Sequence, residues 1–135
     1  MNYMFYNALN FDQDLSTLKI TGITSTNNIN NMLYNTALTT YNYNQLLSGW
    51  SAQNVMKSVN LGIVGLNANK TKYGGCTING LAGIAGYHSL VNSKNWIITD
   101  GGLDSCTITG SITYNPAGPL PSFGSTFATL TLNQT

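Results

Sequence analysis

Two short segments of this chain have nearly the same sequence and lie 28 residues apart. The first is Met4-Phe5-Tyr6-Asn7-Ala8, and the second is Met32-Leu33-Tyr34-Asn35-Thr36-Ala37. Repetition with a period of about 20 to 30 residues and one strand in each unit is typical of a leucine-rich solenoid. Helix-like and strand-like segments also alternate between residues 38 and 102, which favours small stacked α/β turns.

The strongest helix signal covers residues 42–54. Its apolar side chains share one side of a helix: Leu46, Leu47 and Trp50. Thr39 or Thr40 is suited to cap its start, because a threonine hydroxyl accepts a hydrogen bond from the free N–H groups of the first turn. A second helix is expected over residues 81–91. Its stripe of larger side chains is Ile84, Tyr87, His88 and Val91.

Two glycines interrupt this second helix. Gly83 and Gly86 lower its intrinsic stability by up to about 1 kcal/mol each relative to alanine. We expect them to permit close packing against the neighbouring turn.

Three strands are expected before residue 103, over residues 18–23, 59–63 and 96–99. The first has Leu18, Ile20 and Ile23 on one buried face. The third ends at Asp100-Gly101-Gly102, a strong turn signal. The side chains expected to form one core are Leu46, Trp50, Leu61, Ile63, Ile84, Trp96 and Ile98.

The sequence changes character after Leu103. Residues 107–114 and 127–132 alternate apolar and polar side chains, and a loop rich in proline and glycine joins them. This pattern predicts an antiparallel β segment. The expected organisation is therefore a solenoid over residues 1–103 and a C-terminal β appendage over residues 104–135.

Several segments together resemble one known family. They are Met4-Phe5-Tyr6-Asn7-Ala8, Phe11-Asp12-Gln13-Asp14-Leu15-Ser16, Asn42-Tyr43-Asn44-Gln45-Leu46-Leu47-Ser48-Gly49-Trp50, Gln53-Asn54, Val59-Asn60-Leu61-Gly62, Thr71-Lys72-Tyr73 and Asn95-Trp96-Ile97-Ile98-Thr99-Asp100-Gly101-Gly102. They are similar to the closing repeats of BspA-like leucine-rich-repeat surface proteins, over about residues 1–103. The resemblance implies a short α/β leucine-rich-repeat-like solenoid, surface attachment, and contact with protein or glycan.

Charged residues make up only 7% of the 135 residues: five Lys, four Asp, and neither Arg nor Glu. The chain has nineteen Asn and seventeen Thr, so its solubility depends on amides and hydroxyls. The lysines are scattered rather than clustered against phosphates, which argues against nucleic-acid binding. No apolar run approaches the roughly 20 residues that a membrane span needs.

The first residues also lack the basic head and apolar run of a secretory signal. We expect either a piece of a longer exported protein or a chain that reaches an exposed location by another route, as a virion component does.

Catalytic and metal-binding patterns are weak, so we predict no catalytic, cofactor-binding or metal-binding residues. His88 is the single histidine, and we interpret it as a packed or hydrogen-bonded structural side chain. Asp12 and Asp14 are expected to satisfy backbone donors in a turn. Asp100 and Asp104 flank a tight turn and are too few for a calcium loop.

Cys76 and Cys106 either form a disulfide or remain two buried thiols; their spacing does not suit zinc. The remaining lead is aromatic. The chain has many such side chains for its size: Tyr3, Phe5, Tyr6, Tyr34, Tyr41, Tyr43, Tyr73 and Tyr87. They either pack between turns or form a recognition face.

The function expected from these features is a non-enzymatic structural or adhesive surface module, located outside the cell, on a cell surface or on a virion. One alternative is a phage decoration or fibre protein. Another is a carbohydrate-active enzyme, which the shortage of Glu, Arg and His disfavours. The expected partners are a protein or glycan surface, other copies of the chain, or a larger assembly. We also expect the aromatic N-terminal face to be covered by something outside the solenoid itself.

Overall fold

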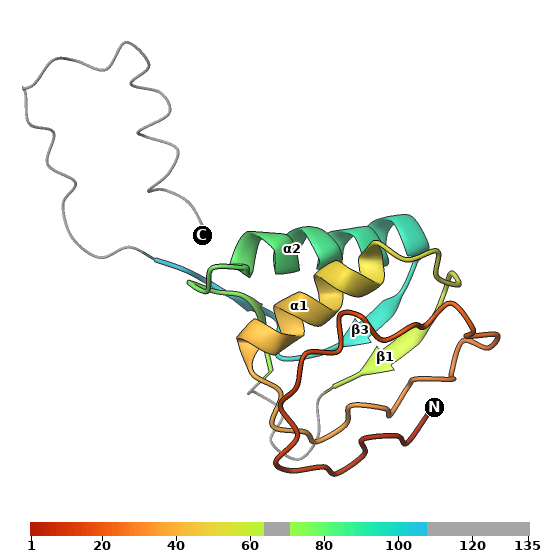
Figure 1. The fold of residues 1–135 in the computed structure, drawn as a ribbon. Helices are drawn as coiled ribbons and strands as arrows, with labels where there is room; N and C mark the ends of the chain where they lie inside the picture. The colour runs from red at the N-terminus through yellow and green to blue at the C-terminus, as the bar shows by residue number, and fades with distance from the viewer. Residues whose placement is uncertain (64–70, 108–135) are drawn as a thin grey trace, which may run out of the picture.

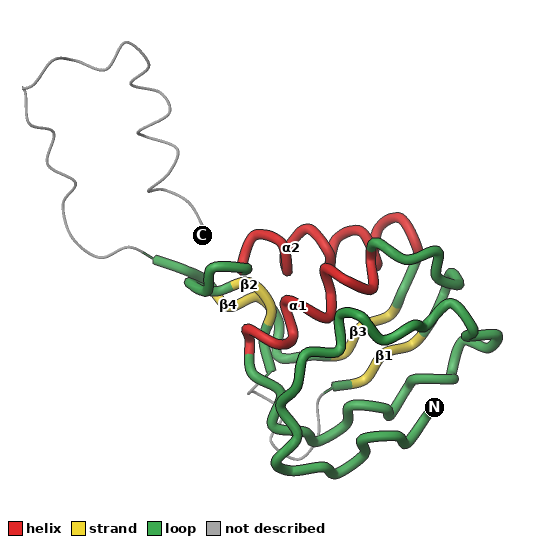
Figure 2. Tube along the Cα trace, viewed as in Figure 1, coloured by secondary structure: helices red, strands yellow, loops and turns green. Residues whose placement is uncertain are grey.

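A computed structural model describes residues 1–63 and 71–107 of the chain. Its elements are α1 (Thr40–Ser51), β1 (Asn60–Gly62), β2 (Tyr73–Gly74), α2 (Gly80–His88), the π-helical turn η1 (Ser89–Ser93), β3 (Ile97–Thr99) and β4 (Leu103–Asp104). The two helices lie side by side along one layer, and β1 and β3 lie beneath them in a second layer (Figure 1). Figure 2 shows that most of the N-terminal third is loop.

The strands pair in parallel across the turns of the chain. In the first pair, Leu61 of β1 is opposite Ile98 of β3, and in the second Tyr73 of β2 is opposite Leu103 of β4. The strands predicted over residues 59–63 and 96–99 are thus confirmed by β1 and β3. Strands β2 and β4 were not predicted, because two-residue strands are too short to show alternation.

Two earlier segments continue the same layer without forming strands. We call the four adjacent segments row 1 (residues 1–8), row 2 (residues 26–36), row 3 (residues 58–63) and row 4 (residues 94–102). Backbone hydrogen bonds connect each row to the next. They include Phe5 N to Met32 O (3.0 Å), Asn7 N to Tyr34 O (2.9 Å), Gly62 N to Asn30 O (2.8 Å) and Ile97 N to Val59 O (3.0 Å). Rows far apart in the sequence therefore lie side by side, as Figure 1 shows.

The strand predicted over residues 18–23 is wrong, since the structure has turns there. Ile20 and Ile23 are nevertheless buried, so the apolar pattern reported burial rather than a strand. The leucine-rich-repeat-like solenoid stays a prediction for the fold class. The antiparallel strands predicted over residues 107–114 and 127–132 lie outside the described residues, apart from Thr107.

The predicted core is largely confirmed. Five of its members are buried: Leu46, Trp50, Leu61, Ile63 and Trp96. The other two, Ile84 and Ile98, are half-buried and pack against the same cluster. The two tryptophan rings meet edge to face with centroids 6.5 Å apart. Each indole N–H also donates to a backbone carbonyl: Trp50 to Leu15 (3.0 Å) and Trp96 to Met56 (2.8 Å).

Helix α1 is confirmed, and Thr39 caps it through a hydrogen bond from Asn42 N to Thr39 Oγ1 (3.3 Å). Helix α2 is shorter than predicted and continues as η1. Its buried face consists of Gly80, Gly83 and Gly86. A Cβ added at Gly86 would lie 2.5 Å from Leu47 O, so the glycines let the two helix backbones approach closely.

This packing corrects the predicted stripe of α2. The glycines rather than the large side chains face α1, and Ile84, Tyr87 and Val91 are half-buried. His88 is exposed, so its interpretation as a packed histidine is wrong. The prediction assumed that the larger side chains of α2 are buried. The glycine face is buried instead, because it allows the backbones of α1 and α2 to lie close together.

Replacing Trp50 with alanine should reduce the free energy of unfolding by about 3–5 kcal/mol, the usual cost of removing a large buried aromatic side chain. Equilibrium denaturation measures this loss. The matched control is Tyr41→Ala on the exposed side of the same helix, where Tyr41 is 44% exposed. A loss below about 1 kcal/mol for Trp50→Ala would contradict the described core.

Gly83→Ala should destabilise the protein by about 1–3 kcal/mol through overpacking, even though alanine is the better helix former. Its Cβ would collide with the Asn44 side chain. Gly22→Ala is the control, because a Cβ there meets nothing within 4 Å. Thermal melts in which Gly83→Ala is more stable than the wild type would show that the two helices are not in close contact.

Candidate functional site

Two amide side chains act as bridges to neighbouring backbone. Asn44, fully buried in α1, donates from Nδ2 to Gly74 O (2.8 Å) and accepts at Oδ1 from Gly74 N (2.8 Å). Gln53 does the same at the other end of the layer, donating to Leu18 O (2.9 Å) and accepting from Ile20 N (3.0 Å). An amide matches a peptide group in both donor and acceptor, so each side chain takes the place of a missing strand neighbour.

Two acidic side chains, Asp12 and Asp14, accept hydrogen bonds in nearby turns. Asp12 Oδ1 accepts from Thr39 N (2.8 Å), Thr39 Oγ1 (3.0 Å) and Asn42 Nδ2 (2.9 Å), at the start of α1. Asp14 Oδ1 accepts from Ser16 N (2.8 Å). The predicted role of both residues in satisfying turn donors is confirmed. Burial raises the pKa of Asp12, but the three hydrogen bonds together lower it by more, so the net pKa is below its ordinary value of 3.8.

A third acidic side chain lies under the helices. The buried Tyr43 hydroxyl donates to Asp100 Oδ2 (2.6 Å), and Gly102 N donates to Asp100 Oδ1 (2.8 Å). Burial raises the pKa of Asp100 above 3.8, and these two hydrogen bonds lower it by less. The pKa of Tyr43 is raised well above its usual value, first by burial and then by the charge of Asp100.

Two tyrosines stack near this pair. The rings of Tyr73 and Tyr87 are parallel within 7° and their centroids are 3.9 Å apart. Burial raises the pKa of both hydroxyls, and the charge of Asp100 contributes to both shifts. Asp100 therefore accepts hydrogen bonds in a half-buried turn, which agrees with the predicted tight turn.

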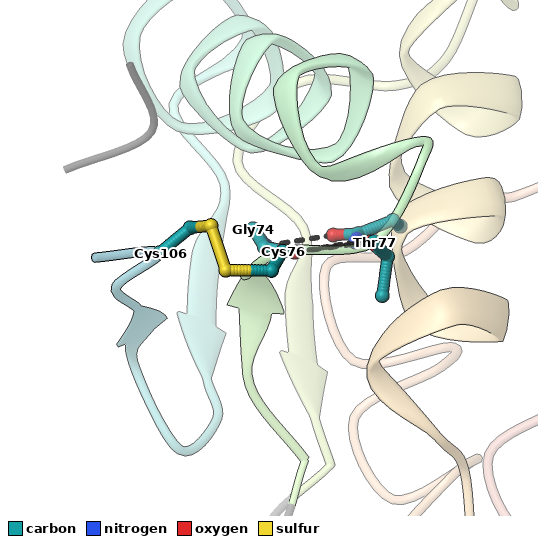
Figure 3. The surroundings of a disulfide bond; sticks show 5 residues. Gly74, Cys76, Thr77 and Cys106 are labelled. Atoms are coloured by element: carbon teal, nitrogen blue, oxygen red, sulfur yellow. Dashed lines mark hydrogen bonds between the residues drawn. A yellow bond between two sulfur atoms is a disulfide. The ribbon is translucent and has the colours of Figure 1, made fainter. Parts of the chain in front are cut away.

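Of the two alternatives for Cys76 and Cys106, a disulfide or two buried thiols, the structure contains the disulfide. Cys76 and Cys106 are joined, with Cα atoms 4.8 Å apart, and the bridge links the segment after β2 to the segment after β4 (Figure 3). It lies beside Gly74 and Thr77, whose hydroxyl donates to Gly74 O (3.3 Å). The disulfide thus holds the chain next to Gly74, the residue to which Asn44 is hydrogen-bonded.

Amide and tyrosine side chains that are exposed or half-buried lie along rows 1 to 3. Asn35 Nδ2 donates to Asn7 Oδ1 (3.0 Å), and Asn60 Nδ2 donates to Asn27 Oδ1 (2.8 Å). The rings of Tyr6 and Tyr34 stack with centroids 5.1 Å apart and planes within 10°. We call this set of side chains the amide–tyrosine surface; three are exposed (Tyr6, Asn7 and Asn27) and three are half-buried (Tyr34, Asn35 and Asn60).

A shallow hollow of about 380 Å³ adjoins this surface at Asn35. Its other lining residues are Leu9, Thr36, Ala37, Leu38, Thr39 and Thr71. The hollow combines hydroxyl and amide groups with small apolar side chains. Such a lining suits an uncharged polar ligand, because it offers donors, acceptors and apolar contact without a charge.

The predicted aromatic residues do not form one site. Tyr43 and Tyr73 are buried, Tyr87 is half-buried, and Tyr3, Tyr6 and Tyr41 are exposed. Phe5 is half-buried and stacks on Phe11 at 4.2 Å. Sequence reasoning missed the asparagines of the amide–tyrosine surface. The repeated Tyr-Asn pair at a spacing of 28 was the one signal that could have located them.

No group of three or more His, Cys, Asp or Glu side chains suited to a metal occurs in residues 1–63 and 71–107. Over the same residues, no helix is long and apolar enough to cross a membrane. Comparison with family models, with curated proteins and with solved structures finds no match to this chain.

The pH dependence of stability should separate the two kinds of aspartate. The folded-state pKa of Asp100 is raised, so its contribution to stability is lost as pH rises above 3.8. That of Asp12 is lowered, so its contribution is lost as pH falls below 3.8. As pH rises from about 3 to 6, Asp100→Asn should therefore gain stability relative to the wild type, and Asp12→Asn should lose it.

Denaturant unfolding at several pH values measures both differences, and each variant is the control for the other. The remaining carboxyls titrate alike in all three proteins and cancel. Differences that change in the same direction for both variants would contradict the described surroundings of Asp100.

Proposed function

We propose that this chain is a non-enzymatic structural or adhesive surface module, which contacts protein or glycan through its amide–tyrosine surface and the adjoining hollow. The observation that carries the proposal is the exposed pairing of Asn7 with Asn35 beside the stacked Tyr6 and Tyr34 rings. Asparagine and tyrosine are adaptable recognition residues, since they combine hydrogen bonding with large, rigid contact area.

The chemistry of the surface favours an uncharged polar partner. A glycan presents hydroxyls for the amides and C–H faces for the rings. A polar protein surface presents peptide groups, which amides match equally well. With 7% charged residues in the whole chain, electrostatic attraction is a weak basis for recognition.

A location outside the cell, on a bacterial surface or on a phage particle belongs to the same proposal. The Cys76–Cys106 disulfide supports an oxidising surrounding, because such bonds persist there and are rare in reducing compartments. The resemblance to BspA-like surface proteins points the same way.

The non-enzymatic part of the proposal is supported by the use made of the acidic side chains. Asp12, Asp14 and Asp100 all accept hydrogen bonds in turns. A general acid or base must instead be free to reach a substrate proton. Incubation of the purified protein with soluble polysaccharides should release no reducing ends. Catalytic turnover that Asp104→Asn abolishes would contradict this part.

Asn35→Gly is the sharpest test of the binding surface. Asn35 has φ 60°, which glycine adopts freely, so the variant removes the amide without straining the backbone. Asn95→Gly on row 4 is the matched control, because Asn95 is exposed and has φ 56°. Binding to immobilised glycans and to protein-coated surfaces should weaken about two- to tenfold in Asn35→Gly, as for the loss of one hydrogen bond, and should be unchanged in Asn95→Gly.

A panel that includes bacterial polysaccharides and extracellular proteins is measured with all three proteins. Equal weakening by both substitutions would show that binding occurs elsewhere. The absence of saturable binding to any member of the panel would contradict the adhesive function.

A further inference from the structure

The backbone hydrogen bonds between row 1 and row 2 all run in the same direction. Row 1 donates backbone N–H groups, from Phe5 to Met32 O and from Asn7 to Tyr34 O. Row 2 in turn donates from Asn35 N to Ile63 O on row 3 (3.4 Å). Row 2 also accepts from row 3, from Asn60 N to Thr26 O (2.7 Å) and from Gly62 N to Asn30 O (2.8 Å), so only the backbone bonds between rows 1 and 2 all run in one direction.

Rows 1 and 2 also have the same local conformation, offset by 28 residues. In row 1, Met4 N donates to Met1 O and Tyr6 N to Tyr3 O, both at 3.2 Å. The equivalent bonds of row 2 run from Met32 N to Ile29 O (3.1 Å) and from Tyr34 N to Asn31 O (3.3 Å). The next residue in each row, Asn7 or Asn35, has positive φ, at 57° and 60°. Row 1 consequently presents on its outer edge the same backbone carbonyl groups that row 2 presents to row 1.

That outer edge carries two acceptors at the repeated positions. They are Met4 O and Tyr6 O, which correspond to Met32 O and Tyr34 O. No N–H of the part of the chain that the structure describes donates to either of them. The side chains around them are exposed, by 52% at Met4 and 42% at Tyr6. Carbonyl groups of this kind form a template for another segment of chain.

The side chains at the repeated positions of row 1 also correspond to those of row 2. Asn35 donates its amide N–H to Asn7 Oδ1, so the amide of Asn7 is oriented to donate to an asparagine one row further out. Tyr6 stacks on Tyr34 and also meets the Tyr3 ring edge to face, with centroids 5.4 Å apart, so an aromatic residue of an added row would join an existing aromatic cluster. The edge thus specifies backbone donors two residues apart, an acceptor amide and an aromatic ring.

We propose that the outer edge of row 1 is an interaction surface for a segment of another polypeptide with the row 1 sequence type, aromatic-Tyr-Asn-small. This edge shares Tyr6 and Asn7 with the amide–tyrosine surface and goes beyond its proposed function, because it adds the backbone acceptors Met4 O and Tyr6 O and takes a polypeptide segment. A two-fold contact with a second copy is disfavoured. It would set Met4 O and Tyr6 O against the same acceptors, while the N–H groups of both residues are used in local turns.

The test adds one more row to the full-length chain, by placing a copy of residues 1–28 in front of Met1. Linking makes docking intramolecular, so even a weak contact is populated. Hydrogen exchange is measured at the amides of the added copy, and the row 2 amide of Asn35 reports whether the original rows remain folded. The amides of Phe5 and Asn7 in the added copy should exchange at least about tenfold more slowly than in the free peptide of residues 1–28.

The matched control carries Tyr6→Ser and Asn7→Gly in the added copy alone, which leaves the original protein intact. Its protection should fall by about two- to tenfold, as expected for a lost ring stack. Exchange of the unsubstituted copy at the rate of the free peptide would overturn the proposal, and so would equal protection in the control. A dimer of the unextended chain in light scattering that persists after the extension would also overturn it.

Discussion

Peptide groups that lack a strand neighbour are the constraint on which this structure depends. Its strands are two or three residues long, and rows 1 and 2 contain none. A buried peptide group without a partner costs about 1–3 kcal/mol, so peptide groups beside such short strands need partners from elsewhere. Asn44 supplies a donor and an acceptor to Gly74 of β2, and Gln53 supplies both to the segment of Leu18 and Ile20.

The other close contacts of the fold follow from the bridge at Asn44. To reach Gly74, the Asn44 side chain must pass where α2 packs on α1, and there α2 has Gly83 instead of a larger residue. Gly74 itself has φ 85°, a left-handed conformation that suits glycine. The Cys76–Cys106 disulfide then fixes the segment that follows. Amide side chains thus have two uses in this chain: exposed ones provide solubility without charge, and the buried Asn44 completes backbone hydrogen bonding.

Sequence patterns predicted the parts of the fold in which one face is buried over several residues. Leu46, Leu47 and Trp50 located α1, and the alternation around Leu61 located β1. The same reasoning assigned a strand around Ile20, because it cannot distinguish a buried strand from buried turns. It placed His88 inside, because it took the larger side chains of α2 as the buried face, whereas the glycines are buried.

The candidate site was less predictable, since it depends on which rows become neighbours. Tyrosines were expected to matter, and the Tyr6–Tyr34 stack agrees with their repeat at 28 residues. The pairing of Asn27 with Asn60 spans 33 residues and carries no such repeat. A mid-helix Asn44 reads as a weak helix former, and its bridging role depends on Gly74, which is 30 residues away.

The most direct test of this account is the free energy of unfolding of Asn44→Ala, measured in denaturant beside Asn92→Ala. Asn92 is exposed, and its side chain makes no hydrogen bond to a described residue. Alanine favours a helix at both positions by up to about 0.7 kcal/mol. If Asn44 completes the backbone hydrogen bonding of β2, Asn44→Ala should nevertheless lose about 2–5 kcal/mol, because Gly74 N loses its partner and Gly74 O keeps only the Thr77 hydroxyl (3.3 Å). Equal stability of the two variants would contradict the account.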